Sequence, residues 1–220
     1  NVIAGIVCNT DYSTEIMTKW TTTAPGQSVN YVESHDNMTL VDKITASVKD
    51  AKPADITQLS QLAASIALLS QGMPFIQAGQ EFLRSKGGDT NSYKSSDLVN
   101  SLKWGTQSAN AATVKYYKGL IALRKAHPAF RMATTDLVKK NLKFLTSPEG
   151  TIAYSINGSD VKDSASTIVV VHNANTTAQT ITLPKSGSWS VLVEAGRAGT
   201  TVLRKITGGS VTVEARSTLV

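Results

Sequence analysis

Two short stretches in the first half of the chain are rich in strand-forming residues. SVNYVES (28–34) and MPFIQAG (73–79) are bounded by polar segments. Pro74 is the second residue of the later run, and proline is tolerated near the start of a strand. Both runs are apolar enough for strands buried on both faces. A long stretch separates them, so the pattern predicts two neighbouring strands of a parallel sheet.

Helical periodicity follows each of these strands. Apolar residues in 54–72 recur every three or four positions, which predicts a helix with Asp55 as its N-cap and Gly72 as its C-cap. A second helix is predicted over 110–126, ended by His-Pro. Its expected buried face contains Val114, Tyr117, Leu120, Ile121 and Arg124. Two strands do not make a stable sheet, so further strands are expected from outside this chain.

The pattern changes near residue 135, after which it is all-β. Short runs of strand-forming residues alternate with Gly, Asn, Ser or Pro. The runs are LKFL, TIAYSI, STIVVVH, QTITL, SWSVLVE, SVTVEA and STLV. They predict an antiparallel sandwich, so the fold class is α/β followed by all-β.

Composition and charge bear on whether the chain binds nucleic acid or a membrane. Apolar residues make up 41% and charged residues 17% of the 220, which is ordinary for a globular protein. The net charge is +6, but the basic residues are dispersed and no basic stripe alternates with aromatics. This favours a solvated surface over nucleic-acid binding. No apolar run approaches the roughly 18 residues of a membrane span, so no membrane partner is expected.

The single cysteine and the first residues carry little information on location. Cys8 stands alone, which allows neither an internal disulfide nor a zinc-type spacing. The opening NVIAGIVC has no initiating methionine, and we expect the chain to begin partway through a longer protein. The compartment stays open, with an extracellular or cell-surface location favoured over the cytoplasm.

Polar clusters lie where the two predicted parallel strands end. HDN (35–37) follows the first and GQE (79–81) follows the second. In α/β folds the carboxyl ends of the strands carry the chemistry, so these groups can face a shared pocket. A His–Asp pair that caps the next segment is the alternative, and Asn37 can equally be a turn residue.

Two segments carry a resemblance to a known family. VNYVESHDNMTL resembles the fourth conserved region of the α-amylase superfamily, glycoside hydrolase family 13, in its debranching branch, the type I pullulanases. GMPFIQAGQEFLRSKGGDTNSYKSSDLVNSLKW resembles the same enzymes, and its NSY loop ahead of VN-x-L-x-W is the more diagnostic element. The matching segments span roughly 25–130. The resemblance implies the last two strands and helices of a TIM (β/α)8 barrel in 1–134 and a β-sandwich domain in 135–220.

The resemblance also implies roles for individual residues. The family hydrolyses α-glucosidic bonds with retention, using a nucleophile, an acid/base and a third carboxylate that stabilises the transition state. Asp36 matches the third carboxylate and His35 the histidine that binds glucose hydroxyls at the cleavage site. Asn37 follows them as a sugar contact or a turn residue. Glu81 matches a segment that shapes the pocket floor.

The polar loop after the second strand supplies further candidates for sugar binding or loop bracing. These are Arg84, Asn91, Tyr93 and Asp97. Trp20 and Trp104 are expected to pack inside the protein. Trp189, in the tail, is expected in the core, with a sugar platform as the alternative.

The chain departs from the family pattern in one large respect. Neither an Arg-x-Asp strand end nor a glutamate in matching surroundings precedes residue 25, so the nucleophile and the acid/base are absent. We therefore expect no hydrolysis by this chain alone. The expected partners are an α-glucan and either the missing N-terminal part of the enzyme or a second copy of the chain. No cofactor is expected, and a structural calcium in the complete enzyme stays open.

Two other functions fit parts of the sequence. A carbohydrate-binding or structural module would bind glucan through residues 137–220, around Trp189, and would not need His35 or Asp36. The chain could also come from an α-1,4-acting amylase or a glycogen-debranching enzyme, which belong to the same superfamily but differ in the glucosidic linkage or substrate that they cleave. The NSY loop favours α-1,6 cleavage, by resemblance only.

Overall fold

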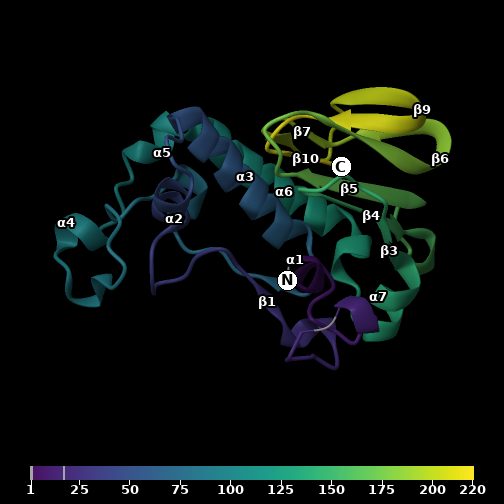
Figure 1. The fold of residues 1–220 in the computed structure, drawn as a ribbon, viewed down its shortest axis with the longest axis horizontal. Helices are drawn as coiled ribbons and strands as arrows, with labels where there is room; N and C mark the ends of the chain where they lie inside the picture. Colours follow the sequence, from purple (N-terminus) through teal and green to yellow (C-terminus); the bar gives the residue numbers. More distant parts are fainter. Residues whose placement is uncertain (1, 17) are drawn as a thin grey trace.

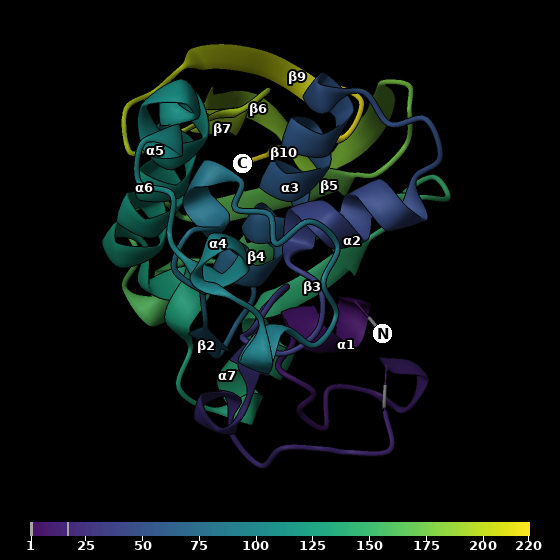
Figure 2. The same cartoon turned by 90° about the vertical axis from the view of Figure 1, so that its left-hand side faces the viewer.

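The computed structural model describes residues 2–16 and 18–220, and two long helices cross its centre (Figure 1). These are α3 (Pro53–Leu69) and α6 (Ala111–Ala126). The strands of the tail lie on one side of them, and α2 (Leu40–Ser47), α4 (Asp97–Asn100) and α5 (Thr106–Ala109) gather at the other end (Figure 1). Turned by 90°, the molecule presents the loops around α2 and α4 to the viewer (Figure 2).

A short parallel ladder lies beneath these helices. It joins β1 (Val29–Asn30) to β2 (Met73–Pro74), with Val29 opposite Met73. The other helical segments before the tail are α1 (Val2–Ile6), α7 (Thr135–Asn141) and the 3-10 turns η1 (Thr14–Ile16), η2 (Pro25–Gln27), η3 (Gln80–Phe82), η4 (Ser92–Lys94) and η5 (Pro128–Arg131). The strand–helix–strand–helix order predicted from the sequence is therefore present.

The tail forms antiparallel sheets. A four-stranded sheet has the order β10-β5-β4-β3, and β6 pairs with β9 and β7 with β8. The bounds are β3 (Leu142–Leu145), β4 (Thr151–Asn157), β5 (Thr167–Asn173), β6 (Gln179–Val191), β7 (Val193–Glu194), β8 (Arg197–Ala198), β9 (Arg204–Val213) and β10 (Ser217–Leu219), with the turn η6 (Ser159–Val161) after β4. The expectation of α/β structure followed by all-β structure is confirmed at this level.

Strand β5 explains how the tail attaches to the helices. Ile168 and Val170 belong to the core shared with α3 and α6, whereas Val169 and Val171 belong to the core under β6 and β9. Both faces of the strand are covered, which is why its sequence is continuously apolar. The four-stranded sheet is thus the middle of three layers.

Arg124 ties the C-terminus of α3 to α6. Its guanidinium donates to the carbonyl oxygens of Leu68 (3.0 Å), Ser70 (2.6 Å) and Gly72. These are carbonyl groups at a helix end, where a cation is favourable. Burial lowers the pKa of Arg124 to about 10, so the side chain stays charged at neutral pH.

A buried carboxylate holds the first strands of the tail against the end of α6. Asp163 follows η6; its Oδ1 lies 2.7 Å from His127 Nδ1, and its two oxygens accept the N–H groups of Ala129 (3.1 Å) and Ala165 (2.9 Å). The Asp163 side chain is fully buried. This cluster is a polar link between the segment after η6 and the end of α6.

Several sequence-based expectations about local structure are wrong. The parallel strands are two residues long, and Val29 and Met73 are exposed, because each strand has a single neighbour in the described chain. The N-cap of α3 is Lys52, whose N–H donates to Asp55 (3.0 Å), and its C-cap is Ser70.

Burial also differs from the expected pattern at some large side chains. Ile121 is exposed, while Tyr116 and Leu123 of the same helix are buried. Trp20 and Trp104 are 79% and 59% exposed and do not belong to the core. The runs QTITL and SWSV form one bent strand, β6.

Candidate active site

Two loops leave the parallel ladder at the same edge of the structure. Residues 31–39 follow β1 and residues 75–96 follow β2, and parallel neighbours have their carboxyl ends on the same side. The loops are connected through Asp42 in the first turn of α2. Its carboxylate accepts the Ser85 hydroxyl and the N–H of Lys86 (2.8 Å). The site is therefore built from two loops fixed to one helix.

The first loop presents His35 and Asp36 to solvent. Their side chains are 86% and 70% exposed, and His35 Nε2 lies 3.4 Å from Asp36 Oδ2. Neither is used as a helix cap, because Thr39 caps α2 by accepting the N–H of Asp42 (3.2 Å). Asn37 has a φ of 63°, a left-handed conformation that Asn tolerates well. Both side chains are thus free to meet a ligand.

Glu33 closes the base of this loop. Its Oε2 accepts the N–H of Leu40 at the start of α2, and its Oε1 is buried without a hydrogen-bond partner among the described residues. The residue is 4% exposed. Burial raises the pKa of Glu33 to about 7, although the bond from Leu40 and the charge of Arg84 act in the opposite direction. The sequence placed Glu33 in the motif but gave it no role.

The raised pKa makes the stability of this loop depend on pH. Because folding favours the protonated carboxyl, the contribution of Glu33 is complete below pH 4.5 and is lost as the pH rises toward 7. A shift of this size corresponds to about 3 kcal/mol. Glu33→Gln keeps the acceptor for Leu40 without the charge, so we expect a gain of up to about 3 kcal/mol in unfolding free energy at pH 8 and none at pH 4.

Urea unfolding followed by circular dichroism at both pH values measures this gain. Glu149→Gln changes an exposed carboxyl in the tail and is the matched control, with no pH-dependent difference expected. If the unfolding free energies of the wild type and Glu33→Gln depended on pH in the same way, the role assigned to the buried carboxyl would be contradicted.

The second loop is braced from within. Arg84 donates to the carbonyl oxygen of Asn100, and the Asn100 amide donates to the carbonyl oxygens of Ser92 (2.6 Å) and Ser95 (3.0 Å). Lys86 Nζ reaches Ser92 Oγ at 2.6 Å. A cavity of about 430 Å³ lies beside this segment. The sequence predicted Arg84 here but missed Lys86 and Asn100, whose roles depend on contacts within the loop.

The other predicted loop residues lie on the surface. Asn91, Tyr93 and Asp97 are exposed, and the Lys94 ammonium lies 5.3 Å from the centre of the Tyr93 ring. Glu81 accepts the N–H of Gly79 (3.0 Å) and so shapes the turn after β2. No hydrogen bond or ion pair joins these residues to His35 or Asp36 within the described chain.

Neither a metal site nor a membrane segment is found in the described residues. No group of three or more His, Cys, Asp or Glu side chains there is placed to hold a metal ion. None of the described helices has the length and apolar character needed to cross a bilayer.

Comparison with known proteins decides the family. The sequence profile of the pullulanase all-beta domain matches residues 138–197. The curated pullulanase of Bacillus subtilis (strain 168) is 41% identical over 170 residues, which cover 77% of this chain and 24% of that protein. The pullulanase structure from Bacillus acidopullulyticus superposes with a TM-score of 0.90 at 39% identity, covering 99% of this chain and 26% of that one.

The chain belongs to the type I pullulanase family. A further pullulanase structure, the type I enzyme of Bacillus subtilis str. 168 complexed with maltose, has a TM-score of 0.90 at 35% identity and is covered over 30% of its length. Isoamylase from Flavobacterium sp is 29% identical over 208 residues. The chain thus spans 24–30% of the length of these pullulanases.

Proposed function

We propose that this chain is the C-terminal part of a retaining glycoside hydrolase that cleaves α-1,6-glucosidic branch linkages in pullulan, starch or glycogen-derived glucans. The observation that carries the proposal is the exposed His35–Asp36 pair at the carboxyl end of β1, in a chain of the pullulanase family. Two related structures contain maltose or maltotetraose, which supports an α-glucan as the ligand.

In this proposal β1, α3, β2 and α6 are two strand–helix units of a larger (β/α)8 barrel. The domain boundary is placed at 134/135, just before α7 and the tail strands. The two short strands and the residues directly after them leave apolar side chains in solvent, among them Val29, Tyr31, Met73 and Phe75. Unpartnered strand edges and apolar faces favour association. The remaining barrel strands, or a second copy of the chain, would cover this face.

Asp36 is the proposed transition-state stabiliser. The oxocarbenium-like transition state carries positive charge on the sugar, and a fixed carboxylate beside it lowers its energy. His35 would donate a hydrogen bond to a glucose hydroxyl at the cleavage site. The proposed nucleophile and acid/base come from outside this chain, so the chain alone is expected to be inactive. Asn37, Arg84, Asn91, Tyr93 and Asp97 are proposed to bind sugar hydroxyls or hold the two loops.

Reconstitution tests this proposal. The chain is mixed with a polypeptide carrying the other barrel strands, and the products from pullulan are separated by chromatography. We expect maltotriose, because only α-1,6 cleavage of pullulan releases intact maltotriose units, and no products from amylose. Each polypeptide alone should be inactive. A folded reassembled pair without activity would count against the proposal, and α-1,4 products would favour the amylase alternative.

A further inference from the structure

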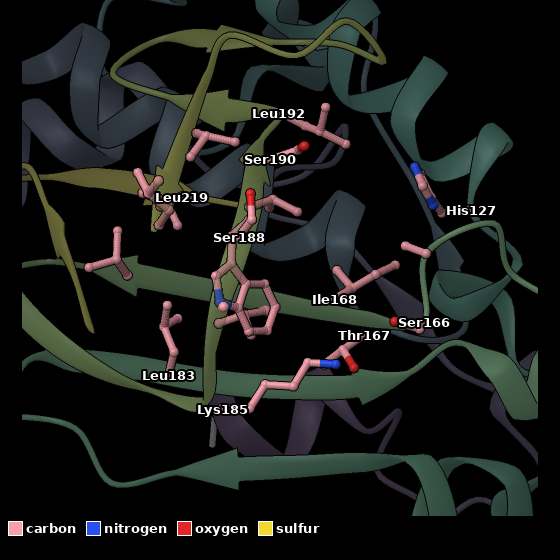
Figure 3. Close-up of a pocket in the computed structure, with 18 of the residues that line it drawn as sticks. His127, Ser166, Thr167, Ile168, Leu183, Lys185, Ser188, Ser190, Leu192 and Leu219 are labelled. Atoms are coloured by element: carbon pink, nitrogen blue, oxygen red, sulfur yellow. The ribbon is translucent and has the colours of Figure 1, made fainter. Parts of the chain in front are cut away.

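The tail contains a cavity that the proposed active site does not use. Its volume is about 270 Å³, near the lower limit of small-molecule sites. It lies between the inner faces of β6 and β5, and the end of α6 closes one side. Figure 3 shows Leu183, Lys185 and Ser188 from β6 and Thr167 and Ile168 from β5 around the same hollow.

A glycine of β6, Gly187, lies on the wall of this space. Gly187 of β6 is paired with Gly208 of β9, directly after the point where the register of the two strands shifts. A Cβ atom added to either glycine would have no heavy atom within 4 Å. A side chain at Gly187, which lines the cavity, would normally fill the gap between the sheets. Two pairs further along the ladder are Trp189 and Ile206, both half-buried and both lining the cavity.

The polar groups around the cavity call for a ligand with oxygen atoms. The indole Nε1 of Trp189 is buried and has no hydrogen-bond partner among the described residues. A buried indole N–H normally has an acceptor, because leaving it without one is costly. The Lys185 side chain lines the same cavity, and its ammonium lies 5.9 Å from the centre of the Trp189 ring. These two donors lie beside a mostly apolar wall.

We propose that this cavity binds a pyranose unit of an α-glucan, as a second sugar site within the β-sandwich. The flat C–H face of a pyranose suits an aromatic ring and the apolar wall, and its ring and hydroxyl oxygens supply acceptors for Trp189 Nε1 and Lys185. An apolar ligand would leave the indole N–H unpaired. The choice of an α-glucan rests on the proposed function, whereas the cavity and its donors do not.

Maltotriose binding to the chain, observed by NMR, tests the proposal. The Trp189 indole N–H resonance, identified by its loss in Trp189→Phe, is followed in the ¹⁵N-labelled chain during the titration. We expect a saturable shift of this resonance. Gly187→Val fills the space without a backbone clash, so the protein should fold while the apparent Kd rises about tenfold or more. Thr207→Val changes the exposed outer face of the same hairpin and should leave the Kd unchanged.

Two outcomes would overturn the proposal. One is a Trp189 resonance that does not move at maltotriose concentrations that saturate a millimolar site, and the other is an equal shift in Gly187→Val. The titration is repeated with Asp36→Asn, which should leave the Trp189 shift unchanged because Asp36 lies in a different part of the chain. The two proposals therefore fail separately. If the reconstituted enzyme is inactive, the Trp189 shift is still expected; if the Trp189 shift is absent, hydrolysis of pullulan is still expected.

Discussion

Asp36→Asn in the complete enzyme is expected to lower kcat on pullulan by about 10³-fold, with little change in the unfolding transition. Asn has nearly the same shape but no charge to stabilise the oxocarbenium-like transition state. The Asp36 side chain is 70% exposed, and its one ion pair among the described residues is with His35, so the substitution removes no core interaction. Steady-state kinetics on pullulan and thermal unfolding measure the two effects separately.

The control for this substitution is Asp50→Asn. Asp50 is also exposed and has a φ of 58°, which Asn adopts readily, but it lies after α2, away from the loop that carries Asp36. We expect wild-type kcat from this variant. An Asp36→Asn enzyme as fast as the wild type would remove Asp36 from the catalytic role and leave the family assignment unchanged.

Asp163→Ala is expected to reduce the unfolding free energy by about 3–5 kcal/mol. The substitution leaves His127 and the N–H groups of Ala129 and Ala165 without their buried acceptor. Asp160→Ala is the matched control, because Asp160 pairs with Lys140 (2.7 Å) at the surface, where such pairs contribute at most about 1 kcal/mol. Chemical denaturation at neutral pH gives both values.

The loss from Asp163→Ala also has a defined pH dependence. Burial alone would raise the pKa of Asp163, but hydrogen bonds from Ala165, His127 and Ala129 hold it below its ordinary value of 3.8. The ionised carboxylate therefore stabilises the fold fully above pH 3.8, and this contribution is lost as the pH falls below that value. Wild type and variant should thus differ less in acid. If Asp163→Ala lowered the unfolding free energy only slightly at neutral pH, the cluster would not be a structural link.

How far the site could be predicted depended on the range of the interactions involved. His35 and Asp36 were found from a strand followed by a polar cluster, together with a resemblance to known enzymes, which are both local signals. Glu33 stood in the same motif, but its burial arises from packing against α2 and the second loop. The bracing by Lys86 and Asn100 likewise depends on how the segment after β2 folds back against α4, which no periodicity along the chain reports.

The tail shows the same division. Strands β3, β4 and β5 were predicted close to their observed bounds, because runs of β-branched residues between turn residues are a local signal. The single bent strand β6 was predicted as two, since the register shift before Gly187 depends on its pairing with β9. Trp189 was expected in the core. It is half-buried and packs against the core under β6 and β9, but it also lines the cavity beside Gly187, which its position in the sequence did not indicate.

The sequence by itself determined the order of elements, the two central helices, the all-β tail and the family. The first three depend on spacing along the chain, which sets the face that a residue presents before any tertiary contact forms. The family came from the resemblance of two motif segments to known enzymes. Only the tertiary structure decided which carboxylates are buried, how Arg124 ends α3, and where a cavity remains between the sheets. Those features come from groups that are distant in sequence and meet only when the layers pack.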